Sequence, residues 1–165
     1  MTKLRSEITI NAPAEQVWAA LADLERVQQF SPGVAKAYYT TDSKEGVGAG
    51  RHCDLQGPSG WVEERITEWN EGESLTIEIF DSNAPIKSAF GRFALTPAGE
   101  ETVVSFSLDY ELKFGPIGAL LNVLFVRRIF GKANKTTLAG LKYHVETGEV
   151  VGTEIPATAP SGAPA

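Results

Sequence analysis

Residues 104–112, VSFSLDYEL, and the long run that follows Gly115-Pro116 decide the fold class of this chain. In the first segment apolar and polar residues alternate strictly, which predicts a strand with one buried face. From residue 117 to 130 the second segment is apolar nearly all round, and its apolar positions then narrow to one face before Gly148. This pattern predicts a helix of about thirty residues, which needs something as large as a twisted sheet to lie against.

The preceding residues supply that sheet. Alternation at residues 4–10 predicts a first strand, and helical spacing between Pro13 and Phe30 predicts two short helices. From residue 34 the period switches to two, and turns rich in Gly, Pro and charged residues separate the apolar runs. The further strands are predicted at residues 34–41, 51–56, 61–69, 75–80, 86–95 and 104–112. The chain is therefore predicted to be an α+β protein, in which a curved antiparallel sheet of about seven strands wraps around a long C-terminal α-helix.

The composition bounds the function classes. A chain of 165 residues is long enough for one domain, expected at residues 1–148 and followed by a disordered Pro/Ala/Gly-rich tail at 149–165. The net charge of −6 argues against a nucleic-acid partner, because phosphate binding needs a basic surface. The single cysteine, Cys53, excludes an internal disulfide, and its spacing from the two His residues matches no metal site. No metal or cofactor is predicted, and because no signal peptide or membrane span is recognisable, the expected location is the cytoplasm.

Three segments carry a resemblance to a known superfamily. Residues 8–18, ITINAPAEQVW, are similar to the strand–"AP.E.VW"–helix start of SRPBCC proteins, and residues 30–34, FSPGV, resemble their "W.P.V" motif with Phe in place of Trp. Residues 48–51 followed by 63–66 resemble the "GvGt.R…ER…E" hairpin of the polyketide cyclase/dehydrase-like branch. The resemblance covers residues 3–147 and implies the helix-grip fold of this START-like, Bet v 1-like superfamily. That fold hosts binding proteins, lipid carriers, cyclases and chaperone cofactors, so it does not define one function.

A sheet curved around a helix leaves a cavity unless large side chains fill it. Small residues on one strand, Ala89, Gly91 and Ala94, and Ala119 on the helix favour a cavity here. Alternation selects the residues expected to face inward and to bind a ligand. These candidates are Arg51, Val62, Glu64, Ile66, Ile77, Ile79, Phe93, Phe106, Leu108 and Tyr110 from the sheet, with Ile117, Leu120, Leu121 and Leu124 from the helix.

Glu64 lies between two apolar residues of matching parity, so it can point inward. A buried carboxylate is costly unless it is paired, and it would then serve as an acid/base or ligand-orienting group. A hairpin turn symmetric about Pro58-Ser59 would place Cys53 opposite Glu64 with Arg51 diagonal to it, whereas a shift of one residue would place His52 opposite. The alternative is a cross-strand ion pair at the sheet surface, which is common in hairpins.

Tyr110 and His52 are the other polar candidates for catalysis. A phenol on an inner face could contact a ligand or donate a proton, or it could be a core tyrosine bonded to the backbone. A strand histidine beside a turn could join Glu64, or it could simply be half-exposed.

Three functions follow from these patterns. The leading prediction is binding of a small hydrophobic or aromatic molecule, such as a lipid or polyketide, in a cavity between the sheet and the C-terminal helix. The enzyme alternative is polyketide cyclase/dehydratase-like chemistry by Glu64 with Arg51 or His52 and Tyr110, and it requires these groups to converge on one cavity. The third is an interaction module that contacts a membrane surface or a protein through the apolar helix and its basic residues, which is less favoured. The oligomeric state does not follow from the sequence.

Overall fold

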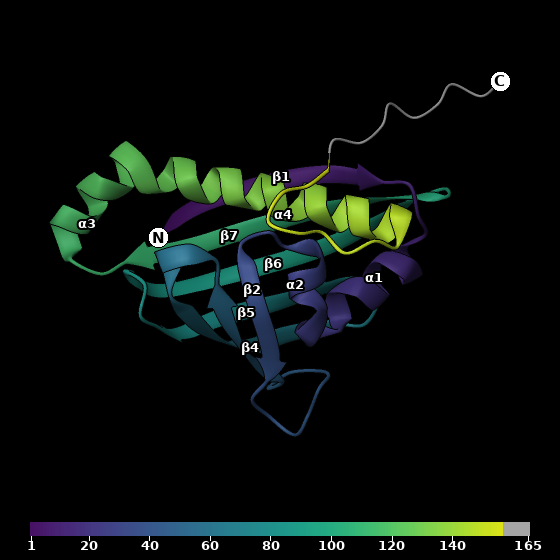
Figure 1. Cartoon of the computed structure of the whole chain (residues 1–165), viewed down its shortest axis with the longest axis horizontal. Helices are drawn as coiled ribbons and strands as arrows, with labels where there is room; N and C mark the ends of the chain where they lie inside the picture. The colour runs from purple at the N-terminus through teal and green to yellow at the C-terminus, as the bar shows by residue number, and fades with distance from the viewer. Residues whose placement is uncertain (157–165) are drawn as a thin grey trace.

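The computed structural model of the chain describes residues 1–156. Its strands form one seven-stranded antiparallel sheet that curves around the C-terminal helix (Figure 1). They lie in the order β1-β7-β6-β5-β4-β3-β2, so every connection after the first joins neighbouring strands. The strands are β1 (Thr2–Ile10), β2 (Val34–Tyr39), β3 (Gly50–Leu55), β4 (Trp61–Asn70), β5 (Ser74–Ser82), β6 (Ile86–Ala98) and β7 (Glu101–Leu112).

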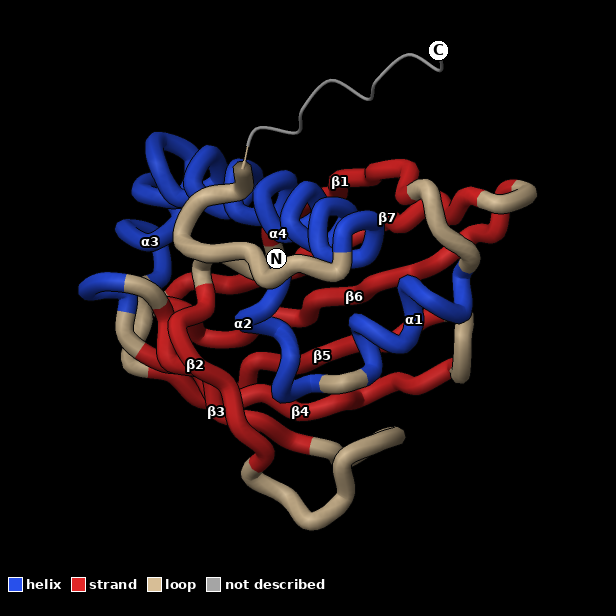
Figure 2. The backbone as a smooth tube through the Cα atoms, turned by 45° about the vertical axis from the view of Figure 1, so that its right-hand side comes forward, coloured by secondary structure: helices blue, strands red, loops and turns tan. Residues whose placement is uncertain are grey.

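The helices fall into two groups and one isolated turn. Between β1 and β2 the chain forms α1 (Ala14–Ala22), η1 (Leu24–Arg26) and α2 (Val27–Phe30), and the 3₁₀ turn η2 (Gly57–Ser59) joins β3 to β4. After β7 it forms α3 (Gly115–Leu121), the π-helical η3 (Asn122–Val126) and α4 (Arg127–Thr147). Figure 2 shows α1, α2 and α4 on the same face of the sheet. The predicted helix-grip fold is confirmed, and the predicted single helix is divided by a π-helical segment.

Helix α4 is held against the sheet and α2 by one apolar face and one close approach. Leu138, Leu141 and Val145 are buried, at the spacing that places them on one side of a helix. Gly140 lies against α2, where an added Cβ would be 1.9 Å from the carbonyl oxygen of Phe30. The backbones of α4 and α2 therefore meet directly, and this contact fixes the helix over the concave face of the sheet.

The C-terminal residues continue to pack after the helix. Gly148 takes the left-handed conformation with φ of 74°, which ends α4 as expected of a glycine at this position. Val151 is then buried, and its amide donates to the carbonyl of Gln29 at 2.8 Å. Val151, which the sequence assigns to the tail, therefore packs against the domain, and the part of the predicted tail at residues 157–165 lies outside the described residues. Within residues 1–156 no helix is long and apolar enough to cross a membrane, and the cytoplasmic location stays a prediction.

Candidate functional site

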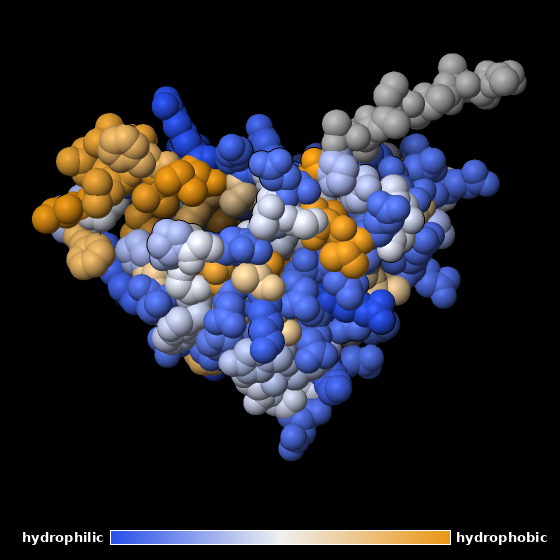
Figure 3. Space-filling model, viewed as in Figure 1, coloured by the Kyte–Doolittle hydropathy of each residue, from blue (hydrophilic) through white to orange (hydrophobic). Residues whose placement is uncertain are grey.

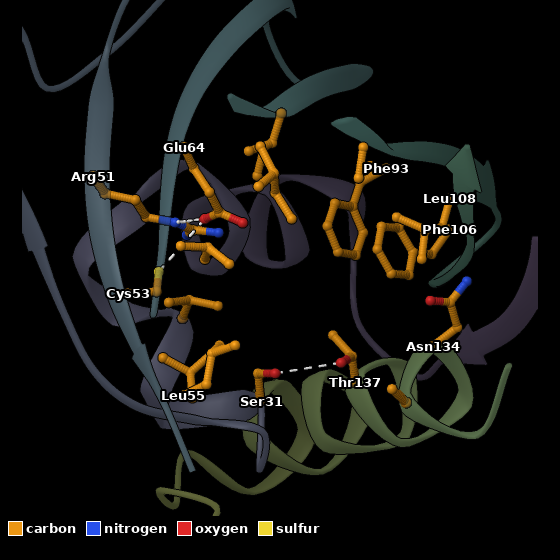
Figure 4. Close-up of a pocket in the computed structure, with 18 of the residues that line it drawn as sticks. Ser31, Arg51, Cys53, Leu55, Glu64, Phe93, Phe106, Leu108, Asn134 and Thr137 are labelled. Atoms are coloured by element: carbon orange, nitrogen blue, oxygen red, sulfur yellow. Dashed lines mark hydrogen bonds and ion pairs between the residues drawn. The ribbon is translucent and has the colours of Figure 1, made fainter. Parts of the chain in front are cut away.

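A cavity of about 220 Å³ lies between the concave face of the sheet and helices α1, α2 and α4 (Figure 4). Most of its lining side chains are apolar, and the polar ones are few. Eight of the residues that the alternation selected line it: Arg51, Val62, Glu64, Ile77, Ile79, Phe93, Phe106 and Leu108. That these residues contact a ligand stays a prediction.

The helical wall of the cavity differs from the predicted one. Ile117, Leu120, Leu121 and Leu124 were expected to line it, but they are 68%, 61%, 44% and 49% exposed and do not reach it. The reason is the turn before α3, where Phe114 and Gly115 both have positive φ, of 77° and 49°. This turn carries α3 beyond the end of β7 (Figure 1).

The residues that do form the helical wall lie later in α4. They are Phe130, Ala133, Asn134 and Thr137, at the i, i+3, i+4, i+7 spacing of one helix face. That spacing is present in the sequence and could have found them. Helices α1 and α2 also contribute apolar residues that the sequence interpretation missed, because it assigned these two helices no part in the site: Leu21, Val27 and Phe30. Ile66 was a predicted wall residue, but it is 1% exposed in the core and does not line the cavity.

The β3–β4 hairpin decides which side chains meet Glu64. Arg51 lies directly opposite Glu64, His52 opposite Glu63 and Cys53 opposite Val62. Both predicted registers are therefore wrong. The loop forms the 3₁₀ turn η2, with the Leu55 amide donating to the carbonyl of Gly60, rather than a turn centred on Pro58-Ser59.

Glu64 points into the cavity and is paired. The Arg51 Nε atom donates to Glu64 Oε2 at 2.5 Å, and Arg51 Nη1 donates to the Leu24 carbonyl at 2.9 Å. Their side chains are only 8% and 13% exposed, so removal of one partner would leave the other charge uncompensated. Burial works against the charged form of Arg51, but the Glu64 carboxylate outweighs it, and the pKa of the guanidinium is raised. In Figure 4 the second oxygen of Glu64 faces the open cavity.

Cys53 lies beside this pair and is inert as a nucleophile. Its Sγ atom is 3.5 Å from Glu64 Oε2, which accepts a weak hydrogen bond from the thiol. Burial, reinforced by the negative charge of Glu64, raises the pKa of Cys53 to about 12. The thiol therefore stays protonated at neutral pH, and a thiolate is the form that nucleophilic chemistry needs.

His52 belongs to the outer face of the sheet. Its Nδ1 atom is 2.5 Å from Glu63 Oε1 and its Nε2 atom is 3.1 Å from Asp54 Oδ1. The ring is stacked between Tyr38 and Trp61. The hydrogen bond to Glu63 raises the pKa of His52. Because neighbouring residues on a strand point to opposite faces, His52 cannot join Glu64 in the cavity.

Tyr110 is buried at the far end of β7, outside the cavity lining. Its hydroxyl donates to Asn122 Oδ1, and Asn122 Nδ2 in turn donates to Thr2 Oγ1 at 2.6 Å. The ring packs edge-on against Phe130. Burial raises the pKa of this phenol, and its partner is a side chain rather than the backbone. The three predicted catalytic residues therefore do not converge.

Asn134 is the most deeply buried of the polar wall residues on α4 that the sequence interpretation missed. It is 2% exposed and lines the cavity beside Phe106 and Leu108 (Figure 4). Its Nδ2 atom is buried without a hydrogen-bond partner among the described residues. Nearby, Ser31 Oγ and Thr137 Oγ1 form a hydrogen bond of 3.3 Å in the same wall. The cavity is thus largely apolar, with an ion pair in one wall and an unsatisfied amide in another. The described residues contain no cluster of acidic, His or Cys side chains that could hold a metal ion.

A helix-grip sheet with an internal apolar cavity is the architecture that the resemblance to START-like, Bet v 1-like proteins predicts. The family described as "Polyketide cyclase / dehydrase and lipid transport" matches residues 1–146, and the chain belongs to this family. Among curated proteins no sequence is significantly similar to it.

Solved structures share the fold at low sequence identity. A protein from Thermus thermophilus is 24% identical, with a TM-score of 0.74 over 89% of this chain and 99% of that one. A START superfamily protein from Mycobacterium smegmatis is 19% identical, with a TM-score of 0.73 over 87% and 97%. The di-domain ARO/CYC BexL from the BE-7585A biosynthetic pathway is 17% identical, with a TM-score of 0.72 over 88% of this chain and 47% of that one. At these identities the similarity concerns the fold.

Proposed function

We propose that this protein binds a small, largely hydrophobic molecule that carries an oxygen atom, and holds it in the cavity under α4. The observation that carries the proposal is the unpaired amide of Asn134 in the wall of a largely apolar cavity. A buried donor without a partner costs about 1–3 kcal/mol. In Figure 4 the Oδ1 atom of Asn134 lies on the side of the open cavity and Nδ2 points away from it. A half-turn of the amide group brings Nδ2 to the cavity, where a ligand oxygen would accept its hydrogen bond and remove that cost.

The size of the cavity limits the ligand. At about 220 Å³ it is smaller than the ~300–1,000 Å³ typical of sites for drug-sized molecules. The rings of Phe93 and Phe106 stack with their centroids 4.2 Å apart and form an aromatic part of the cavity wall. A compact aromatic or short-chain molecule fits such a space, in agreement with the leading sequence-based prediction.

Binding is better supported than catalysis. The family includes both cyclases and lipid-transport proteins by its description, so membership does not choose between them. Of the three predicted catalytic groups only Glu64 reaches the cavity, and it is paired with Arg51. A lone ion-paired carboxylate can orient a ligand hydroxyl, whereas the acid–base chemistry of the alternative needs a second proton-handling group there.

Calorimetric titration with 2-naphthol and naphthalene tests the proposal, because the two probes differ only in one hydroxyl group. We expect both to bind and 2-naphthol to bind about tenfold more tightly, which corresponds to one hydrogen bond of about 1.4 kcal/mol. In Asn134→Leu the preference for 2-naphthol over naphthalene should fall. Ala89→Phe fills the cavity and should abolish both. Failure of both probes to bind the unmodified protein, or an unchanged affinity ratio in Asn134→Leu, would contradict the proposal.

A further inference from the structure

The segment from Phe114 to Ile129, called the apolar overhang below, contains eight of the 13 exposed large hydrophobic side chains among the described residues. Figure 3 shows it as a continuous hydrophobic region over α3 and the start of α4. Eight of its large apolar side chains are 44–73% exposed, and six of them lie close together in the chain: Ile117, Leu120, Leu121, Val123, Leu124 and Phe125. Isolated exposed apolar residues are normal, whereas a contiguous patch marks a contact surface.

The overhang is built with its polar side inward. Gly118 packs against the end of β7, where an added Cβ would be 2.3 Å from the carbonyl oxygen of Lys113. One turn later Asn122 bonds to Tyr110 and to Thr2. The face toward the protein therefore consists of a small residue and a hydrogen-bonded amide, and these contacts fix the apolar side chains outward. A helix that merely completed a core would have the opposite orientation.

The charge around the overhang differs from that of the whole chain. Six of the 15 Lys and Arg residues, and none of the 21 Asp and Glu residues, lie between residues 112 and 145. Arg127, Arg128, Lys132 and Lys135 are exposed just after the apolar side chains. Among the described residues, none of these four lies within 4.0 Å of a carboxylate oxygen. A protein of net charge −6 thus concentrates unpaired positive charge beside its largest apolar surface.

We propose that the apolar overhang docks on the surface of an anionic lipid bilayer. The apolar side chains enter the boundary between headgroups and acyl chains, and the four cations contact the lipid phosphates and carboxylates. A two-fold contact between two copies of this chain through the overhang would give these cations no partner, because residues 112–145 contain no Asp or Glu, and this opposes that occupant. The docking concerns this surface alone and does not depend on ligand binding in the cavity.

Flotation of the full chain with lipid vesicles tests the proposal. We expect binding to phosphatidylcholine vesicles that contain phosphatidylserine, at least tenfold weaker binding to phosphatidylcholine alone, and a loss on going from low to high salt because exposed charges are screened. The double variant Leu124→Ser, Phe125→Ser should lose about tenfold or more. Its matched control is Val47→Ser, Phe80→Ser, two apolar side chains of similar exposure elsewhere, which should change binding less than about twofold.

The charge contribution is tested by reversal. Arg127→Glu with Arg128→Glu should weaken binding about tenfold. Lys36→Glu with Lys44→Glu changes the net charge equally and should change the binding free energy by less than half as much. Sedimentation velocity without vesicles shows whether a second copy of this chain, rather than a bilayer, covers the overhang. Failure of the unmodified protein to bind anionic vesicles, an equal loss in the two control variants, or a dimer that only the overhang variants dissociate would each overturn the proposal.

Discussion

The two halves of the C-terminal helix are both rich in apolar residues, but they turn opposite sides toward the protein. In α4 the apolar side faces inward, with Leu138 and Leu141 buried, and the charged side faces solvent. In the apolar overhang the small and polar residues face inward and the apolar residues face outward. Each half also places one asparagine toward the protein: Asn134 has an unpaired amide, and Asn122 is hydrogen-bonded on both sides. Apolar content alone therefore does not reveal which face of a helix is buried; the positions of glycine and asparagine do.

Truncation of one leucine in each half should give the largest difference. Leu138→Ala removes a side chain that is 1% exposed and should lower the free energy of unfolding by about 2–5 kcal/mol. Leu124→Ala, at a side chain that is 49% exposed, should change it by less than about 0.5 kcal/mol. Urea denaturation followed by circular dichroism measures both. Similar losses in the two variants would show that the overhang packs against the protein after all.

Glycine substitutions in α4 should give the next largest effect. Gly140→Ala places a methyl group against the Phe30 carbonyl and should cost about 1–3 kcal/mol, because two backbones must separate. Gly131→Ala is the matched control in the same helix, where an added Cβ meets nothing within 4 Å. It should be neutral or stabilise the protein by up to about 1 kcal/mol, since alanine favours the helix. Thermal denaturation of the two variants compares them, and a neutral Gly140→Ala would contradict the close approach.

The two asparagines should respond with opposite signs. Asn134→Leu removes an unsatisfied buried amide and should raise the free energy of unfolding by about 1 kcal/mol. Asn122→Leu leaves the buried Tyr110 hydroxyl without its partner and should lower it by about 1–3 kcal/mol. Chemical denaturation of both variants gives the sign directly. A loss of stability in Asn134→Leu would mean that its amide is satisfied in the free protein.

A smaller effect, the dependence of stability on pH, is expected from His52, which lies outside both halves of the helix on the outer face of the sheet. The pKa of His52 is raised in the folded state by its hydrogen bond to Glu63. A raised folded-state pKa stabilises the protein at pH values below the unfolded pKa of about 6.5, and this stabilisation is lost as the pH rises through the folded pKa. Glu63→Gln should remove most of this dependence. A proton NMR titration that places the His52 pKa at or below the unfolded value would refute the assignment.

The fold was largely predictable because period-two alternation and the long helix are local signals. The inner face of β7 follows directly from its alternation, and so does the placement of Phe106 and Leu108 at the cavity. The hairpin register was not predictable, because the choice between a tight turn and the 3₁₀ turn η2 moves every cross-strand partner of Glu64.

The direction of the overhang was also not predictable. It depends on Phe114 and Gly115 having positive φ, and a phenylalanine gives no sequence signal for that conformation. The role of Asn134 was missed for another reason. A single polar residue in a helix looks the same in sequence whether its amide is solvated, paired or buried unpaired, and only packing distinguishes these states.

Native mass spectrometry of the full chain, purified from the cells that produce it, tests the ligand-binding proposal most directly. The unmodified protein should carry a non-covalent mass excess that disappears on denaturation. The excess should be absent from Ala89→Phe, whose cavity is filled, and retained by Leu124→Ser, Phe125→Ser, whose cavity is intact. The released compound should be a small hydrophobic molecule containing oxygen. The bare mass of the chain under native conditions, or an excess that Ala89→Phe retains, would contradict binding in this cavity.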